Sequence, residues 1–422
     1  MKILFLTHYF PPEVNAPANR TYEHCREWAK ETDVTVITNF PNHPDGKIFK
    51  GYKNKLIQKE KVDGINVIRL WTFITPNEGF LLRTLNYVIF MIASVFYAVI
   101  SRIKFDVVVA TTPQFFCGLA GKYISVIRRK PLILELRDIW PESIVAVGAL
   151  RNKIIIRLLE RMEMSLYRHA KKIISLTRSF KKNLIARGID RRKIDVIYNG
   201  VSLNHFNKKA EISNKELSEF LCNGFKIGYI GTVGMAHSIN TLVKAADILK
   251  KTDVKFVIVG SGAEREKIEI EIKERELKNI VVFPLQPKKE IPSIINSLDV
   301  FCVHLKKNKL FETVIPSKIF EGMIMKKPIL MGVEGESRKI IEEANCGIPF
   351  EPENYNELAD LILKYKNNQN LIIEHGNNGF EFVQRNFDRI KLAENYLTTI
   401  SNVVNKSNKS SFITKKNNQI TF

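Results

Sequence analysis

The feature that most limits the fold of this chain is a repeated alternation of short apolar runs with longer helical stretches. In the first half, a helical stretch covers residues 21–30, and apolar runs of strand length stand at KILFL, DVTVIT, DGINVIRL, FDVVVAT and PLILELRD. A second series follows at residues 226–230, 255–259, 279–283, 300–305 and 328–331. Such alternation predicts parallel strands with crossover helices. The fold class is therefore α/β, with two doubly wound domains.

The two series predict the domain organisation. A chain of 422 residues with 45% hydrophobic content is long enough for two or three domains with real cores. We expect one domain over residues 1–204 and a second that begins at 205, with a cleft between them that suits a two-substrate reaction. The tail at 402–422 is rich in Ser, Asn and Lys, so we expect it to be disordered and basic.

Charge and cysteine content narrow the class of partner. A net charge of +21 suits nucleic acid, an anionic membrane surface or phosphorylated substrates. Nucleic acid is disfavoured because no RNP-like, KH-like or helix-turn-helix pattern occurs. The five cysteines are scattered without zinc-site spacing, which predicts a reducing compartment and no metal site. The first apolar run is too short for a signal peptide, so we expect the cytoplasmic side.

Two segments suggest a membrane surface. Leu85 to Ile100 is the most hydrophobic run, yet it is shorter than the about 20 residues that a span requires. A buried crossover helix, a helix dipped into one leaflet and a true span remain alternatives. The stretch from Arg151 to Lys193 is strongly basic, with apolar residues at helical spacing. Such a helix is typical of anionic lipid binding, so together the segments predict a peripheral association with the membrane.

The stretch VIPSKIFEGMIMKKPIL predicts a phosphate site. Ser317 can cap a helix that begins at Lys318, whose first turn and side chain would both suit a phosphate. Glu321 lies on the same side of that helix and can accept hydrogen bonds from a ribose diol. An ordinary surface helix with a solvated Glu-Lys face is the alternative.

Other candidates stand where strands end. Gly231 in YIGTVGMAH and Gly260 in VGSGAERE follow strands and precede helices, so either can bring the backbone close to a phosphate or serve only as a turn. In the first domain, ligands should lie at the carboxyl ends of strands. That rule draws attention to a group of polar residues, which are His8, Glu13, Asn15 and Asp138.

Seven motifs stand in a fixed order along the chain: THYFPPE at the start, PNHPDGK at 41–47, LRDIWPES at 136–143, VIYNGV at 196–201, YIGTVGMAH at 229–237, VGSGAERE at 259–266 and PSKIFEGMIMKKPIL at 316–330. In this order they resemble glycosyltransferase family 4, the retaining sugar-nucleotide enzymes of the GT-B fold, and most resemble its WbuB/CapL-type branch. The resemblance implies two Rossmann-like domains, with a UDP-sugar donor held by residues 205–375. It also implies that a helix at 376–401 returns to the first domain.

The resemblance assigns roles residue by residue. Glu321 matches the second glutamate of the family's Glu-x7-Glu motif, which binds the donor ribose. Asp138 matches a residue close to the reacting sugar, so Asp138 and Glu321 are the predicted catalytic pair. The predicted donor-binding residues are Gly231, His237, Gly260, Lys309, Ser317, Lys318 and Glu321. The predicted acceptor-binding residues are His8, Glu13, Asn15 and Asp138.

The chain also departs from the family pattern. The first glutamate of the motif would fall at Thr313, and Glu312 is one residue out of register. GMAH replaces the usual Arg and Lys after the glycine turn, so His237, Lys309 and Lys318 become the candidates for diphosphate contact. The glycine-rich loop after the first strand reads Asn15-Ala-Pro-Ala. These differences concern the contacts of the donor sugar more than the fold.

The implied function is sugar transfer from UDP to a polyprenyl-diphosphate-linked acceptor in O-antigen or capsular polysaccharide biosynthesis. An N-acetylated amino sugar such as N-acetylfucosamine is one candidate for the transferred group. No metal or other cofactor is expected, because backbone amides and Lys can stabilise departing UDP. Two alternatives stay open: a UDP-sugar 2-epimerase of the same architecture, and a catalytically silent basic protein that binds membrane or nucleic acid.

Overall fold

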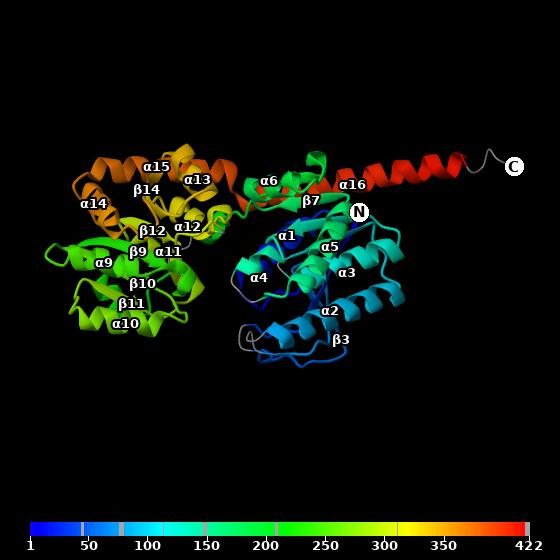
Figure 1. The fold of residues 1–422 in the computed structure, drawn as a ribbon, viewed down its shortest axis with the longest axis horizontal. Coiled ribbons are helices and arrows are strands. Elements are labelled where there is room, and N and C mark those ends of the chain that lie inside the picture. Colours follow the sequence, from blue (N-terminus) through cyan, green and yellow to red (C-terminus); the bar gives the residue numbers. More distant parts are fainter. Residues whose placement is uncertain are drawn as a thin grey trace. The chain divides into compact units, whose positions relative to one another are not determined.

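The computed structural model describes residues 1–43, 46–75, 80–112, 114–146, 150–206, 210–309 and 311–417. It divides into an N-terminal unit, Met1–Tyr198 with Ile390–Phe422, and a C-terminal unit, Asn199–Arg389. Each unit has its own sheet with flanking helices (Figure 1), so the predicted α/β class with two Rossmann-like domains is confirmed. The boundary predicted at 204 lies at 198.

The N-terminal unit is built on an eight-stranded sheet in the order β3-β4-β2-β1-β5-β6-β7-β8. All neighbouring pairs are parallel except β3 with β4. Because β1, β5 and β6 are adjacent, the loops that follow them share one edge of the sheet. The strands are β1 Lys2–Leu6, β2 Asp33–Asn39, β3 Ile57–Val62, β4 Ile65–Leu70, β5 Val107–Thr111, β6 Leu132–Leu136, β7 Lys172–Ser175 and β8 Ile194–Val196.

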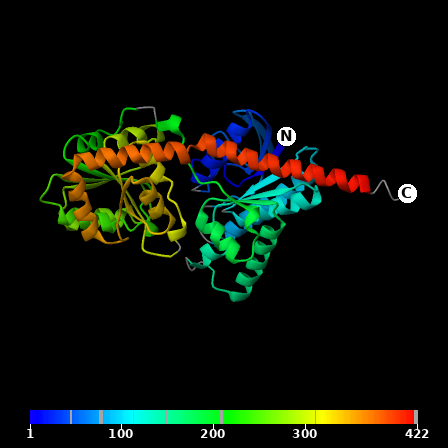
Figure 2. The ribbon, with the colours of Figure 1, turned by 90° about the horizontal axis from the view of Figure 1, so that it is seen from above.

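Helices cover both faces of this sheet (Figures 1 and 2). α2, α3, α5 and α6 share a core with one face, and α1 and α16 share a core with the other. Within α2, Leu82–Ile100 is long and apolar enough to cross a membrane by length and composition, and 22% of this segment is buried. The helices are α1 Ala16–Trp28, α2 Phe80–Ile100, α3 Phe115–Ile127, α4 Glu142–Ala146, α5 Lys153–His169, α6 Arg178–Ala186 and α16 Arg389–Asn417.

The C-terminal segment corrects two predictions. The segment 376–401, expected as one returning helix, is divided between α15 (Gln369–Asn386) in the C-terminal unit and α16 in the N-terminal unit. The tail expected to be disordered is helical through Asn417. α16 is held by α1, because Trp28 Nε1 donates to the carbonyl oxygen of Ala393 at 2.8 Å and the Trp28 ring meets Tyr396 edge-on.

The C-terminal unit contains a parallel six-stranded sheet in the order β11-β10-β9-β12-β13-β14. β9 lies between β10 and β12, so the turns after these three strands meet at one edge. The strands are β9 Phe225–Ile230, β10 Val254–Val259, β11 Ile280–Phe283, β12 Val300–His304, β13 Ile329–Gly332 and β14 Gly347–Pro349. The helices are α7 Leu203–Phe206, α8 Lys215–Phe220, α9 Asn240–Ile248, α10 Arg265–Glu274, α11 Ile291–Asn296, α12 Lys318–Ile324, α13 Glu336–Ala344, α14 Tyr355–Lys366 and α15.

Candidate functional site

Two glycine turns lie against each other at the carboxyl ends of β9 and β10. The N–H of Gly231 donates to the carbonyl oxygen of Val259, and that of Val233 donates to Ser261, both at 2.9 Å. A Cβ at Gly260 would lie 1.8 Å from the carbonyl oxygen of Gly231, whose own φ is +145°. Glycine is therefore required at both positions for backbone packing, whatever ligand the turns receive.

Lys318 reaches back from the start of α12 to the turn at Gly231. A Cβ at Gly231 would lie 2.6 Å from Lys318 Nζ, so the missing side chain makes room for the ammonium group. Nζ lies 4.0 Å from the centre of the Tyr229 ring, and it is buried without a hydrogen-bond partner among the described residues. Burial lowers the pKa of Lys318 to about 8, although nearby Glu321 favours the charged form. Such an unpaired ammonium beside glycine turns suits an anionic ligand.

Glu321 lies one helical turn after Lys318 on α12 and is partly buried. Burial raises the pKa of its carboxyl group, while the positive charges of Lys318, Arg389 and Lys288 favour the ionised form. An ionised carboxylate can only accept hydrogen bonds. Its position is therefore suited to a ligand that presents hydroxyl groups beside its anionic part.

His237 ends a short 3₁₀ turn, η2 (Met235–His237), next to the same tyrosine. Its ring lies edge-on to the Tyr229 ring with 6.3 Å between the centroids. Burial, assisted by the charge of Lys318, lowers the pKa of His237 to about 4, so the ring is neutral at pH 7. His237 Nδ1 is buried and unpaired within the described part of the chain. The ring can therefore exchange a hydrogen bond with a ligand but adds no positive charge.

The start of α12 differs from the prediction. Ser317 has helical dihedral angles, φ −60° and ψ −22°, and its side chain makes no capping hydrogen bond. The N–H groups of Ile319 and Phe320 donate to the carbonyl oxygens of Pro316 and Ser317, each at 3.1 Å. The predicted Ser317 cap is wrong because this tight turn already satisfies those donors. The positive charge at this place comes from the Lys318 side chain.

In the N-terminal unit, Glu13 joins the loop after β1 to the loop after β2. Its carboxylate is 2% exposed and accepts three backbone hydrogen bonds, from Asn42 at 3.0 Å, His43 at 2.9 Å and Phe10 at 3.3 Å. Burial raises the pKa of this carboxyl group, and the three donors oppose that effect. The predicted acceptor residue Glu13 thus fixes the shape of two loops.

His8 and Asn15 support the same loop. His8 is 4% exposed, its Nε2 lies 3.2 Å from Asn39 Nδ2, and burial lowers its pKa to about 3. The ring of His8 therefore lies beneath the surface, and its predicted contact with an acceptor stays a prediction. Asn15 caps α1, since its Oδ1 accepts the N–H of Ala18 at 2.9 Å.

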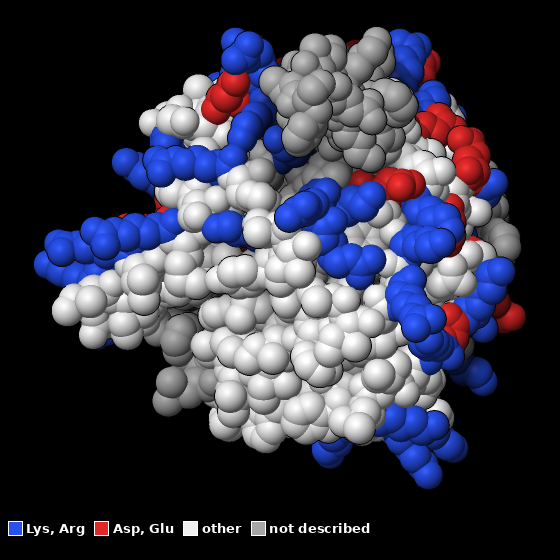
Figure 3. Space-filling view, turned by 90° about the vertical axis from the view of Figure 1, so that its right-hand side faces the viewer, with Lys and Arg blue, Asp and Glu red and all other residues white. Residues whose placement is uncertain are grey.

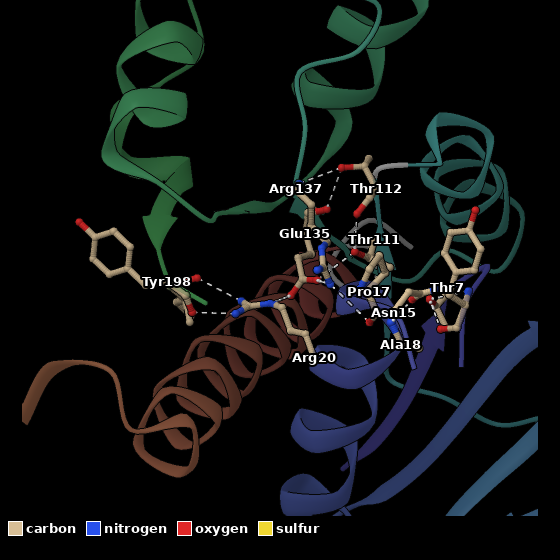
Figure 4. Close-up of polar contacts among 12 residues, drawn as sticks. Thr7, Asn15, Pro17, Ala18, Arg20, Thr111, Thr112, Glu135, Arg137 and Tyr198 are labelled. Atoms are coloured by element: carbon tan, nitrogen blue, oxygen red, sulfur yellow. Dashed lines mark hydrogen bonds and ion pairs between the residues drawn. The ribbon is translucent and has the colours of Figure 1, made fainter. Parts of the chain in front are cut away.

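The sequence reasoning missed a buried ion pair between Arg20 and Glu135 (Figure 4). Their side chains are each 1% exposed, and Arg20 Nε lies 3.2 Å from Glu135 Oε2. Arg20 also donates to the carbonyl oxygens of Tyr198 at 2.7 Å and Ile197 at 3.1 Å. Thr111 Oγ1 donates to Glu135 Oε1 at 2.9 Å. The signal was present, because a glutamate inside the apolar strand LILEL requires a buried partner.

Arg137 extends this cluster toward the end of β6. Its guanidinium lies 3.8 Å from Glu135 Oε1 and donates to the carbonyl oxygen of Pro17 at 3.4 Å. The backbone N–H of Arg137 donates to Thr112 Oγ1 at 2.9 Å (Figure 4). The predicted catalytic residue Asp138 follows directly and is partly buried. The cluster therefore fixes the backbone from which Asp138 projects.

Comparison with known proteins shows to which class of protein this chain belongs. Residues 215–386 match the family model "Glycosyl transferases group 1", and residues 18–205 match "Glycosyltransferase Family 4". The chain is 22% identical to WcaI of Escherichia coli K12, named as a colanic acid biosynthesis glycosyl transferase, over 95% of this chain and 100% of that protein. It is 23% identical to CapM of Staphylococcus aureus, a capsular polysaccharide biosynthesis glycosyltransferase, over 65% and 71% of the two chains.

The solved structures agree on the fold. Anabaena HepE, crystallised with UDP and glucose, superposes with a TM-score of 0.69 at 19% identity, over 95% of this chain and 99% of that chain. This chain is a glycosyltransferase with the GT-B fold. Its N-terminal unit is of the family 4 type and its C-terminal unit of the group 1 type.

In this glycosyltransferase the predicted donor residues are only partly brought together. The turn at Gly231 is in contact with Gly260 and Lys318, and Lys318 lies close enough to Glu321 and His237 to affect their pKa values. Lys309, by contrast, is exposed on the loop after β12. Among the described residues, no group of three or more His, Cys, Asp and Glu side chains is placed to hold a metal ion.

Proposed function

We propose that this glycosyltransferase moves a sugar from UDP to an acceptor carried on polyprenyl diphosphate, with retention of configuration at the anomeric carbon. The single observation that carries the proposal is the buried ammonium group of Lys318 beneath the glycine turn at Gly231, which has no hydrogen-bond partner in the described part of the chain. A buried charge without a partner is unfavourable, so a ligand that supplies the opposite charge is expected to bind there.

A UDP-sugar has the groups that this site lacks. Its diphosphate would pair with Lys318 and approach the backbone at Gly231, where no side chain blocks it. The ribose hydroxyls would donate to Glu321, and neutral His237 would exchange one hydrogen bond with a phosphate oxygen or the sugar. The relatives give independent support, since Anabaena HepE has been crystallised with UDP-glucose.

In the reaction, the bond between the anomeric carbon and the diphosphate oxygen breaks, and the acceptor hydroxyl oxygen forms the new bond on the same face. The proton of that hydroxyl passes to the departing diphosphate. Negative charge accumulates on the leaving group, and Lys318 stabilises it increasingly as the bond breaks. Asp138 would orient the acceptor hydroxyl or stabilise positive charge on the sugar ring.

The relatives and the charge support the proposed acceptor and pathway. WcaI and CapM are named for colanic acid and capsular polysaccharide biosynthesis, so we place this enzyme in the synthesis of a cell-surface polysaccharide, of the O-antigen or capsule kind. Resemblance to the WbuB/CapL branch favours an N-acetylated amino sugar. An acceptor on a polyprenyl chain lies in a membrane, so we propose that the protein works at its cytoplasmic face.

The test is transfer of label from a panel of UDP-sugars to membranes that contain polyprenyl-diphosphate-linked acceptor. Lys318→Ala should lower the transfer rate more than it lowers UDP-sugar affinity, because the interaction strengthens toward the transition state. Lys326→Ala, in the turn just after the same helix and exposed, is the matched control.

Three outcomes would contradict the proposal. Lys318→Ala with wild-type turnover would place leaving-group stabilisation elsewhere. A UDP-sugar altered without any acceptor would indicate an epimerase. A protein whose thermal unfolding UDP does not shift would be a binding protein without a nucleotide site.

A further inference from the structure

The helix α2 has its apolar side facing outward. Along the side that packs on the protein stand Asn86, Phe90, Ser94 and Ala98, all at most 4% exposed and spaced four residues apart. Within the described residues, Asn86 Oδ1 and Ser94 Oγ are buried without hydrogen-bond partners. The opposite side carries the larger apolar groups, with Leu82, Leu85, Ile92, Phe96 and Ile100 between 45% and 66% exposed. A helix exposed to water shows the reverse pattern, so the outer side of α2 is suited to an apolar medium.

Two neighbouring helices continue this apolar surface. α3 packs beside α2, and Lys122 on α3 donates to Ser165 on α5 at 2.6 Å, so the three helices are consecutive on this face of the sheet. The exposed apolar residues that they add are Tyr123, Val126 and Ile127 on α3 and Ile154, Ile155 and Leu158 on α5. Figure 3 shows this face as a broad area without charged side chains. Exposed apolar areas of this extent mark interaction sites.

A groove runs between α2 and α3 within this surface. Its volume is about 450 Å³, and its lining residues are Met91, Ile92, Val95, Phe96, Val99, Ile100, Tyr123 and Ile127. Pockets for polar small molecules carry several placed hydrogen-bonding groups. Here the Tyr123 hydroxyl is the one polar side-chain group of the lining. The groove is therefore suited to an apolar ligand.

Positive charge borders the apolar surface. No Asp, Glu, Lys or Arg occurs in α2 between Arg83 and Arg102, and no acidic residue occurs in α3. Glu160 is the exposed acidic residue of α5. The exposed basic residues at the border are Arg102, Lys104, Arg129, Lys153, Arg157 and Arg161. Lysine and arginine at the edge of an apolar surface can extend to lipid headgroups while the centre enters the acyl region.

We propose that the outer surface of α2, α3 and α5, the lipid face, inserts into one leaflet of an anionic bilayer, with an acyl chain of a bilayer lipid in the groove between α2 and α3. A bilayer fits better than a protein partner because the apolar centre and basic border match acyl chains and anionic headgroups together. α2 lies along the leaflet, because its other side packs on the sheet. The inference deepens the proposed function, which requires an acceptor embedded in a membrane.

Vesicle flotation of the full chain tests the lipid face. Wild-type protein should float with vesicles of phosphatidylcholine and phosphatidylglycerol, and the bound fraction should fall several-fold, without vanishing, as salt increases. Binding to phosphatidylcholine alone should be weaker. The double variant Ile92→Asp/Phe96→Asp should lose at least about tenfold in bound fraction, since a carboxylate is costly in the acyl region. Leu285→Asp is the matched control, because Leu285 is 71% exposed in the other unit and Phe96 is 66% exposed.

The groove is tested separately with a lipid that carries a photoreactive diazirine on its acyl chain. Crosslinks should be found in peptides of α2 and α3 and should disappear in the double variant. Absence of wild-type flotation at every ionic strength, or equal losses in Leu285→Asp, would overturn the proposal. Crosslinking confined to other peptides would show that the groove between α2 and α3 does not hold an acyl chain. UDP binding of the double variant, measured in the same samples, should equal that of the wild type. A failure of the lipid face is therefore distinguished from a failure of the proposed sugar transfer.

A separate set of contacts surrounds the η2 turn of the C-terminal unit. His304 at the end of β12 is 1% exposed, with Nδ1 2.8 Å from the carbonyl oxygen of His237 and Nε2 3.0 Å from the backbone nitrogen of Glu353. The N–H of Glu353 must donate in the second bond. The ring proton is therefore on Nδ1, which donates to His237.

Glu353 holds the turn from its other end. Its carboxylate accepts the hydroxyl of Ser238 at 2.9 Å and the N–H of Lys307 at 3.0 Å. Ser238 and Glu353 have φ of +45° and +70°, which residues other than glycine adopt when their surroundings hold them there. We infer that His304 and Glu353 are positioning residues that place His237 for the donor. This inference rests on the proposed function of the turn.

The test compares two variants at each position. His304→Ala and Glu353→Ala should weaken UDP binding by at least about tenfold, while kcat at saturating donor stays within about twofold. His304→Asn should recover most of the affinity, because its amide N–H can replace Nδ1–H. Glu351→Ala is the control, since Glu351 is exposed and pairs with Lys307 Nζ at 2.5 Å. Equal affinities in His304→Ala and His304→Asn, or a loss in kcat alone, would overturn the role. Wild-type protein that fails to bind UDP would instead refute the proposed function.

Discussion

Replacing Lys318 with methionine should stabilise the ligand-free protein and, at the same time, weaken its binding of UDP. Methionine keeps an unbranched apolar chain beside the Tyr229 ring and removes the unpaired ammonium group. Burial lowers the pKa of Lys318 from its ordinary value of 10.5 to about 8. At about 1.4 kcal/mol for each pH unit, the buried charge therefore destabilises the folded state by about 3 kcal/mol.

The sign of the pH dependence follows from the protons bound in each state. Below the folded pKa of about 8, folded and unfolded Lys318 are both protonated, so the folded state has the full penalty. Between that value and 10.5, the folded state has released its proton and the unfolded state has not. The free energy of unfolding of the wild type then rises with pH. The gain in the free energy of unfolding from Lys318→Met is therefore about 3 kcal/mol at neutral pH. It falls toward zero as the pH approaches the pKa of Lys318 in the unfolded state.

Urea denaturation at neutral and alkaline pH measures this gain, and thermal unfolding with UDP measures binding. Lys326→Met is the control, because Lys326 Nζ lies 4.8 Å from the Phe380 ring but is exposed. That variant should lose only about 0.5–1 kcal/mol, the value of an exposed cation–π contact. A Lys318→Met variant that is no more stable than wild type at neutral pH, or whose melting temperature UDP shifts as much as that of the wild type, would refute the role of the buried charge. A gain that persists at alkaline pH would show that packing, not charge, causes it.

Three other substitutions have defined outcomes. Glu321→Gln should weaken UDP binding by about 1.5–3 kcal/mol in calorimetry, the range for a hydrogen bond to a charged group, and unchanged affinity would exclude a ribose contact. Gly231→Ala places a Cβ 2.6 Å from Lys318 Nζ at a φ of +145°, so it should destabilise the protein by about 1–3 kcal/mol and remove the shift in melting temperature with UDP. Arg20→Met leaves Glu135 buried without its main partner and should lower the free energy of unfolding by about 3–5 kcal/mol in urea, of which Glu135→Gln in the same chain should restore a part. A loss no larger than the about 1 kcal/mol of a surface pair would show that Glu135 is satisfied by other groups.

The sequence predicted the central strands of both sheets because parallel strands covered on both faces are continuous apolar runs. β5 reads VVVAT and β10 reads VKFVIV, and both are almost wholly buried. The missed strands lack this signal. β3 reads IQKEKV and is an exposed antiparallel edge, and β14 has only the residues GIP. β7 and β8 are short and lie within the basic stretch.

The tail was missed for a different reason. Its polar composition has no sustained apolar period, which is the usual sign of disorder. In the structure α16 continues into the tail, whose first residues pack, since Val403 and Val404 are 9% and 7% exposed in the core of the N-terminal unit. A helix anchored in this way propagates into polar residues at little cost per residue, which composition does not reveal.

The position of Lys318 shows which part of the site could have been predicted. Side chains of a helix point toward its N-terminus, so a lysine at the first helical position extends back toward the strand ends. That rule was available from the sequence. That the space beside Gly231 would accept its Nζ depends on the close packing of two glycine turns. That packing is a contact between segments distant in sequence, which no local pattern specifies.

Because position 313 is Thr313 and not a glutamate, the site has no second carboxylate to neutralise the buried Lys318. Glu312, one residue away, cannot move into register, because a Cβ at Gly335 would lie 2.0 Å from the Glu312 carbonyl oxygen and Ser337 Oγ donates to the Val314 carbonyl oxygen at 2.7 Å. Both contacts hold the backbone, and the Glu312 side chain is exposed. A site with two carboxylates could neutralise Lys318 internally. Here Glu321 is the motif's one remaining carboxylate, so the diphosphate of the donor must supply the balancing charge. Affinity for the donor should therefore depend more strongly on Lys318 than it would in a site with two carboxylates.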